Sequence, residues 1–125
     1  MLASEIIEKI KQKIEDIPSG SLEIVYQSAL ATLLGEMGLH PERRRTETGG
    51  VPDFFVGDSE PPLLIEIKQS GDWRCVGEAA AQLWSYSVGL PSITQKIAVF
   101  GGPLVHESHK GMLESLNIRY IVRGG

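Results

Sequence analysis

Two carboxylates and one lysine stand at spacings in this sequence that suit the hydrolysis of a phosphodiester. Asp53 follows Pro52 at the start of an apolar run, and Glu66 and Lys68 flank Ile67 further along the chain. On adjacent strands, the two carboxylates would hold a hard cation such as Mg²⁺, which prefers oxygen ligands and keeps several waters. The ammonium would lie beside the attacking water. We therefore expect a metal-assisted hydrolytic site at Asp53, Glu66 and Lys68.

Each of these residues also has a plainer interpretation. Asp53 could be a turn residue, but Phe54 follows it at once and begins a buried strand, so a charge at the mouth of that strand needs a partner. Glu66 and Lys68 could be a weak ion pair on a solvated strand face. We favour the site because the strand that carries them is otherwise apolar.

Two further spacings are helical. Gly20-x-x-Glu23-x-x-Tyr26 puts the glutamate and the tyrosine three residues apart, and Gln82-x-x-x-Tyr86 puts its pair four apart, so each pair shares a helix face. Glu23 and Tyr26 could equally be a capping or surface pair. Tyr86 could pack at the rim of its helix with Gln82 in solvent.

The densest basic run, Arg43-Arg44-Arg45, lies just before Asp53. Such runs are usually solvated strand edges. Its place in the chain also suits contact with phosphate, so we include Arg45 among the expected substrate-binding residues. Tryptophans pack in the core or at its rim more often than they stack on nucleobases, so we expect such packing for Trp73 and Trp84.

Hydrophobic periodicity changes along the chain from helical to alternating and then switches between the two. Helices are expected over residues 4–17, 21–37, 76–90 and 105–116. Strands are expected over 42–48 (a polar edge), 51–56, 63–69, 96–100 and 118–122. On strand 63–69, Leu63, Ile65 and Ile67 share one face. Alternation places Glu66 and Lys68 on the other face, so this strand should divide core from site.

Composition limits the classes of function. The chain has 125 residues, 42% of them hydrophobic, which fits one domain over residues 1–125. A single cysteine excludes an intrachain disulfide and a zinc site built on several thiolates. No apolar run is long enough for a bilayer and the N-terminus does not resemble a signal peptide, so a cytoplasmic protein without a membrane partner is expected. The net charge of −4 argues against DNA binding by bulk charge, but acidic metal ligands count toward that charge until metal binds.

The order of elements and the motifs resemble the PD-(D/E)xK nuclease superfamily, whose common core would cover about residues 21–100. More narrowly, the first helical spacing resembles the small GxxExxY family, and the second resembles the QxxxY element of RecB-type nuclease domains. The resemblance implies an α/β, restriction-endonuclease-like three-layer sandwich around one mixed sheet, preceded by an N-terminal helix.

The resemblance also implies roles for individual residues. The metal ligands would be Asp53, Glu66, the carbonyl of Ile67 and Glu23. Lys68 would assist the water. Gln82, Tyr86 and Tyr26 would contact the substrate.

The leading expectation is therefore a Mg²⁺- or Mn²⁺-dependent deoxyribonuclease that cleaves by activated-water attack. The alternative is a nuclease-fold module, weakly active or inactive, that binds nucleic acid or serves in an assembly. Divalent-metal binding separates the two. DNA is the expected partner, and a homodimer or a larger nuclease assembly is an alternative to action as a monomer.

Overall fold

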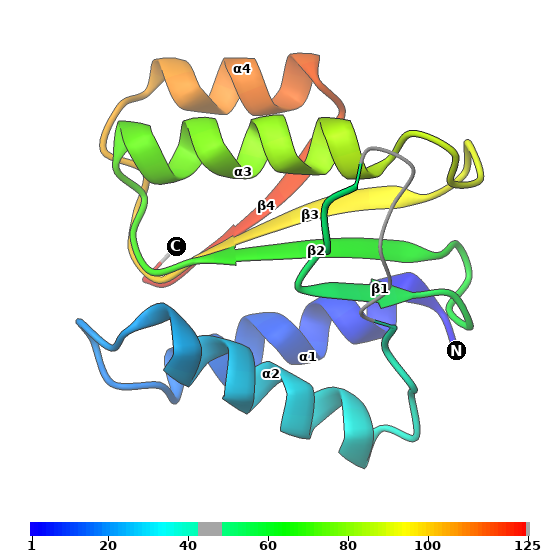
Figure 1. Ribbon diagram of the computed structural model, residues 1–125. Coiled ribbons are helices and arrows are strands. Elements are labelled where there is room, and N and C mark those ends of the chain that lie inside the picture. The colour runs from blue at the N-terminus through cyan, green and yellow to red at the C-terminus, as the bar shows by residue number, and fades with distance from the viewer. Residues whose placement is uncertain (43–48, 125) are drawn as a thin grey trace.

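The computed structural model describes residues 1–42 and 49–124. Helices and strands follow one another along the chain as shown in Figure 1. They are α1 (Ala3–Glu15), α2 (Glu23–Glu36), β1 (Phe54–Val56), β2 (Leu63–Lys68), α3 (Trp73–Tyr86), β3 (Gln95–Phe100), α4 (Ser108–Ser115) and β4 (Ile118–Val122). No helix in these described ranges is long and apolar enough to cross a membrane.

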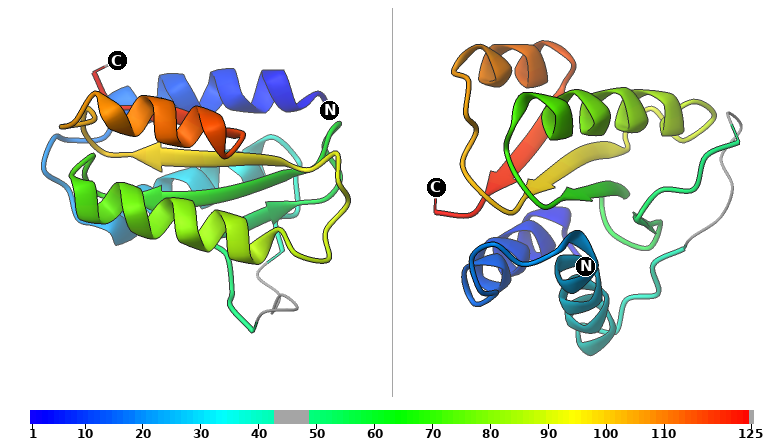
Figure 2. Two further views of the ribbon diagram at one scale, coloured as in Figure 1. Left: turned by 90° about the horizontal axis from the view of Figure 1, so that it is seen from above. Right: turned by 60° about the vertical axis from the view of Figure 1, so that its left-hand side comes forward.

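The sheet is mixed and its strands lie in the order β1-β2-β3-β4. β1 runs antiparallel to β2, while β3 and β4 each run parallel to the strand before. α1 and α2 cover one face of the sheet, and α3 and α4 cover the other (Figures 1 and 2). The structure is thus the expected α/β sandwich of three layers around one mixed sheet.

Two hydrophobic cores lie on the two faces of the sheet, and β2 contributes to both. Leu63, Ile65 and Ile67 belong to the core beneath α1 and α2. Leu64 belongs to the core beneath α3. The predicted alternation along this strand is confirmed, with the addition that the second face is also packed.

Several boundaries differ from expectation. The third helix begins at Trp73 rather than at residue 76, because the Asp72 side chain caps it by accepting a hydrogen bond of 2.8 Å from the Cys75 N–H. β1 is shorter than the expected strand 51–56. Of the expected edge strand 42–48, Glu42 forms an isolated antiparallel bridge with Phe55, and residues 43–48 lie outside the described ranges.

Candidate functional site

The site forms where β2 continues beyond the end of β1. β1 pairs with residues 63–65 only, so within the described ranges the rest of β2 has a strand neighbour, β3, on one side alone. On the open side, Asp53 Oδ2 accepts a hydrogen bond of 2.8 Å from the Ile67 N–H. The Asp53 N–H donates to Glu66 Oε1 at 2.9 Å. The Asp53 carboxylate thus accepts the hydrogen bond that the Ile67 N–H would otherwise donate to a neighbouring strand.

The charged groups of this site are buried. Asp53, Glu66 and Lys68 are 9%, 4% and 7% exposed. Burial, followed by the neighbouring charge of Asp53, raises the pKa of Glu66 to about 8, although the hydrogen bond from the Asp53 N–H and the positive charge of Lys68 oppose the shift. Glu66 therefore holds a proton near neutral pH when no cation is bound.

The first turns of α2 close the site from below. Glu23 begins the helix and Gln27 lies one turn further on. Gln27 Nε2 donates to Asp53 Oδ1 at 2.8 Å and to Glu23 Oε2 at 3.3 Å, so its amide bridges two carboxylates. Burial raises the pKa of Glu23, as does the charge of Asp53. Sequence reasoning missed Gln27, although its place four residues after Glu23 is a detectable signal.

α3 closes the site from above with one row of polar side chains. Glu78 Oε2 lies 3.6 Å from Lys68 Nζ. Gln82 follows one turn later, and its buried Oε1 has no hydrogen-bond partner among the described residues. Tyr86 follows at the next turn, and burial, followed by the charge of Glu66, raises its pKa. The row therefore begins at a residue that contacts Lys68 and ends at one whose pKa is raised by the charge of Glu66.

Of the expected substrate-binding residues, one does not line this site and another lies outside the described residues. Tyr26 is fully buried, and its hydroxyl donates to the Gly101 carbonyl oxygen at 3.3 Å. It therefore joins α2 to the loop after β3 and is not available to a substrate. Arg45 lies outside the described residues.

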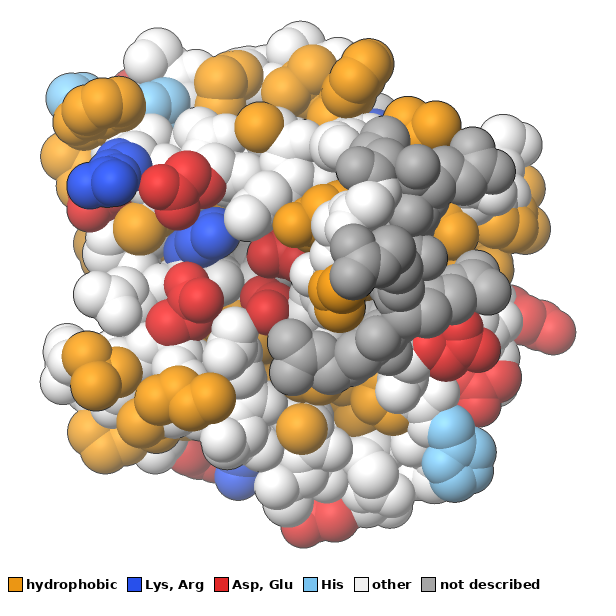
Figure 3. All heavy atoms as spheres, in the orientation of Figure 1, with side chains coloured by type: hydrophobic (Ala, Val, Ile, Leu, Met, Phe, Trp, Pro, Cys, Tyr) orange, Lys and Arg blue, Asp and Glu red, His pale blue; other side chains and the backbone are white. Residues whose placement is uncertain are grey.

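Acidic and basic side chains gather between α3 and α2 in the middle of the face drawn in Figure 3. Among the described residues, no three Asp, Glu, His or Cys side chains form a metal-binding group. The oxygen donors at the centre are the carboxylates of Asp53 and Glu66. The carbonyl of Ile67 points to their side of β2, because the N–H and C=O of a strand residue point the same way. This set suits Mg²⁺, which binds one or two carboxylates and keeps its remaining ligands as water.

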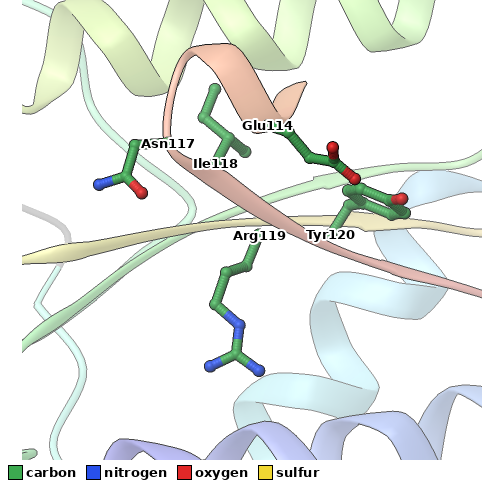
Figure 4. A pocket seen from close by; sticks show the side chains of 5 residues that line it. All are labelled: Glu114, Asn117, Ile118, Arg119 and Tyr120. Carbon is green, nitrogen blue, oxygen red and sulfur yellow. The ribbon is translucent and has the colours of Figure 1, made fainter. Parts of the chain in front are cut away.

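A hollow of about 340 Å³ lies elsewhere, at β4 and the end of α4. Its lining includes Glu114, Asn117 and Arg119. Figure 4 shows the Arg119 guanidinium extending away from the other two polar groups, so no set of functional groups converges there. The buried carboxylates at β2 remain the candidate site.

No family model matches the sequence, and no curated protein matches it. Two solved structures resemble the fold. A repair endonuclease from Pyrococcus abyssi superposes with a TM-score of 0.55 and 18% identity, over 74% of this chain and 44% of that one. An EndoMS–double-stranded DNA complex gives a TM-score of 0.52 and 18% identity, over 77% and 44%.

The chain thus spans less than half the length of either neighbour. At this identity the likeness concerns the fold. Membership of the GxxExxY family and the role of the QxxxY element stay predictions. Together with the mixed sheet between two helical layers, the neighbours establish a restriction-endonuclease-like fold.

Proposed function

We propose that this protein hydrolyses phosphodiester bonds in DNA with Mg²⁺ or Mn²⁺ as its cofactor. One observation carries the proposal: two buried carboxylates lie together at the open edge of β2. Glu66 accepts a hydrogen bond from the Asp53 N–H and Asp53 accepts one from the Ile67 N–H, while Lys68 follows on β2. The fold, shared with two endonucleases, supports it.

The electrostatics of the pair favour a ligand site over a structural ion pair. Backbone N–H groups hold Asp53 and Glu66 in place, and the nearest ammonium, Lys68, also contacts Glu78. Burial and then the like charge of Asp53 disfavour a second negative charge here, and together they raise the pKa of Glu66 to about 8. A divalent cation bound by Asp53, Glu66 and the Ile67 carbonyl would activate a water and stabilise negative charge on the phosphate.

Lys68 has the features expected of a group that stabilises charge. Its side chain is buried on a strand, so it is held in place before the reaction, and a preorganised charge in a dry site is worth more than one in water. Glu78 orients the ammonium from α3. We assign Lys68 to the charge that develops on the phosphate, or to the attacking water.

Gln82 and Tyr86 would position the DNA strand. The Gln82 amide has a buried oxygen without a partner in the described part of the chain, and burial, followed by the charge of Glu66, raises the pKa of Tyr86. Neither is a charged oxygen ligand, so both suit the substrate better than the cation.

In the proposed reaction, water attacks phosphorus, the bond to the leaving oxygen breaks, and no covalent bond to the protein forms.

The test is a cleavage assay with single-stranded, double-stranded, flapped and branched DNA in Mg²⁺, Mn²⁺ or EDTA. Wild type should cut at least one substrate with metal and none in EDTA. Glu66→Gln should lose activity, whereas Glu36→Gln, a matched change on the exposed end of α2, should keep it. Absence of metal-dependent cleavage, or equal activity of the two variants, would contradict the proposal and favour the binding-module alternative.

A further inference from the structure

The outer side of α3 carries both tryptophans of the chain. Trp73 and Trp84 are 68% and 61% exposed, so the expectation that they pack in the core or at its rim is not met. Gly77 and Ala81 lie between them at helical spacing. Large exposed aromatic surface beside small residues marks a binding surface more often than a packing defect.

A pocket of about 510 Å³ opens at the N-terminal half of this side. It is lined by Trp73, Arg74 and Glu78 and by two small residues, Gly77 and Ala81, which we call its floor. A Cβ added at Gly77 would meet no described atom within 4 Å, so the floor is open to a ligand. Trp84 does not line this pocket.

The pocket is continuous with the candidate active site through one residue. Glu78 lines the pocket, and the same carboxylate lies 3.6 Å from Lys68 Nζ. A group bound against Trp73 therefore lies beside the centre where the phosphate would be cut. Arg74 lies 3.3 Å from the other oxygen of Glu78, with 79% of its side chain exposed and free to approach a further anion.

We propose that this pocket binds an unpaired nucleobase of the strand being cut, with the base stacked on the Trp73 indole and Arg74 at the adjoining phosphate. The proposal rests on the proposed function and names its substrate class: DNA that is single-stranded beside the scissile bond. An indole over a floor of small residues accepts any base, because every base has a π-face. A base inside a duplex is already paired and stacked, so duplex DNA does not fill the pocket.

The two tryptophans provide a direct binding assay, because the chain has no others. In Trp84→Ala the only indole is Trp73, and in Trp73→Ala it is Trp84. An oligothymidylate of about ten nucleotides, titrated in EDTA so that no cleavage occurs, should quench the fluorescence of Trp84→Ala and leave that of Trp73→Ala nearly unchanged. A blunt-ended duplex of two fully complementary strands, which has no unpaired base, should quench neither variant.

Affinity gives a second readout. Stacking on one aromatic side chain corresponds to about a ten- to hundredfold change in the dissociation constant. Trp73→Ala should lose that factor, Trp84→Ala should stay within about twofold of wild type, and Trp73→Phe, which keeps an aromatic face, should recover most of the loss. Equal affinities of Trp73→Ala and Trp84→Ala, or equal quenching by duplex, would overturn the proposal.

These experiments distinguish a failure of the pocket proposal from a failure of the proposed nuclease function. Metal-dependent cleavage of single-stranded DNA at equal rates by Trp73→Ala and Trp84→Ala would overturn the pocket and leave the nuclease intact. Quenching of Trp73 by the oligothymidylate without cleavage of any substrate would support the pocket and contradict the nuclease.

Discussion

The two halves of β2 are equally buried and chemically opposite. Leu63, Leu64 and Ile65 have strand neighbours on both sides and apolar side chains on both faces. Glu66 and Lys68 lie on the same strand, under the same helix, at nearly the same low exposure. The difference is that β1 pairs only as far as Ile65. Beyond that point the carboxylate of Asp53, the residue before β1, accepts the hydrogen bond of the Ile67 N–H.

The comparison shows how this fold can bury charge. The end of a strand pairing frees backbone N–H and C=O groups, which must find other partners. A carboxylate meets that need and is fixed in position by it. One half of the strand therefore contributes stability, and the other keeps charged groups in a rigid arrangement at some cost in stability.

The largest effect is expected from the apolar half. Ile65→Ala removes a fully buried side chain from the core beneath α1 and α2 and should destabilise the protein by about 2–5 kcal/mol. Glu66→Gln, one residue on, should cost far less in EDTA, because the amide is neutral like the protonated carboxyl and keeps the acceptor for the Asp53 N–H. Urea unfolding measures both, and equal losses would erase the distinction between the two halves.

Lys68→Ala should act on the reaction and spare the fold. Charge stabilisation of this kind is worth about 10²–10³ in rate, measured under single-turnover conditions with metal. Lys96→Ala is the control, because Lys96 lies at the opposite end of the neighbouring strand β3. Wild-type activity in Lys68→Ala would remove this residue from the proposed mechanism.

Stability should depend on pH through Glu66. Its pKa in the folded protein, about 8, lies above the ordinary value of 4.5, so the folded state binds the proton more tightly than the unfolded state does. Without metal, the contribution of Glu66 to stability is therefore greatest below pH 4.5 and declines as pH rises toward 8. The decline by pH 8 should be on the order of 4 kcal/mol, because each pKa unit corresponds to about 1.4 kcal/mol. It should be seen in urea midpoints with EDTA, and Glu66→Gln should flatten it. A slope that Glu66→Gln leaves unchanged must come from other groups.

The smallest effects belong to α3. Gln82→Ala and Tyr86→Phe should each weaken cleavage by about tenfold, the loss of roughly one hydrogen bond to a charged group. Neither should change metal binding in a calorimetric titration. A collapse of metal affinity in either variant would place these side chains among the cation's ligands.

Local patterns in the sequence predicted most of this arrangement. Alternation alone separated Ile67 from Glu66 and Lys68, because the period of a strand does not depend on what packs against it. Gln27 was missed because its role depends on the approach of α2 to Asp53, which is a tertiary contact. Tyr26 lies one turn from Glu23 as the spacing predicts, but spacing cannot tell which side of a helix faces the core.

The same limit applies to the tryptophans of α3. Their residue type favours burial, whereas the row formed by Val76, Ala79, Ala80 and Leu83 already fills the side that faces the sheet. The remaining side of the helix has no core to enter. Exposure of Trp73 and Trp84 thus follows from the competition between two helix faces.

The central claim is that the charged half of β2 is a cation site, and thermal melting with excess Mn²⁺ or with EDTA tests it most directly. Glu66→Gln is a better test than Asp53→Asn. Both oxygens of Asp53 accept hydrogen bonds, and asparagine has only one side-chain oxygen to do so. A ligand that binds only the folded state, at about 100 times its dissociation constant, stabilises by about 2.7 kcal/mol. Wild type and Glu36→Gln should therefore melt at a higher temperature in Mn²⁺ than in EDTA, and Glu66→Gln should not respond. A wild type without a metal-dependent shift, or a Glu66→Gln variant with the same shift, would contradict the account.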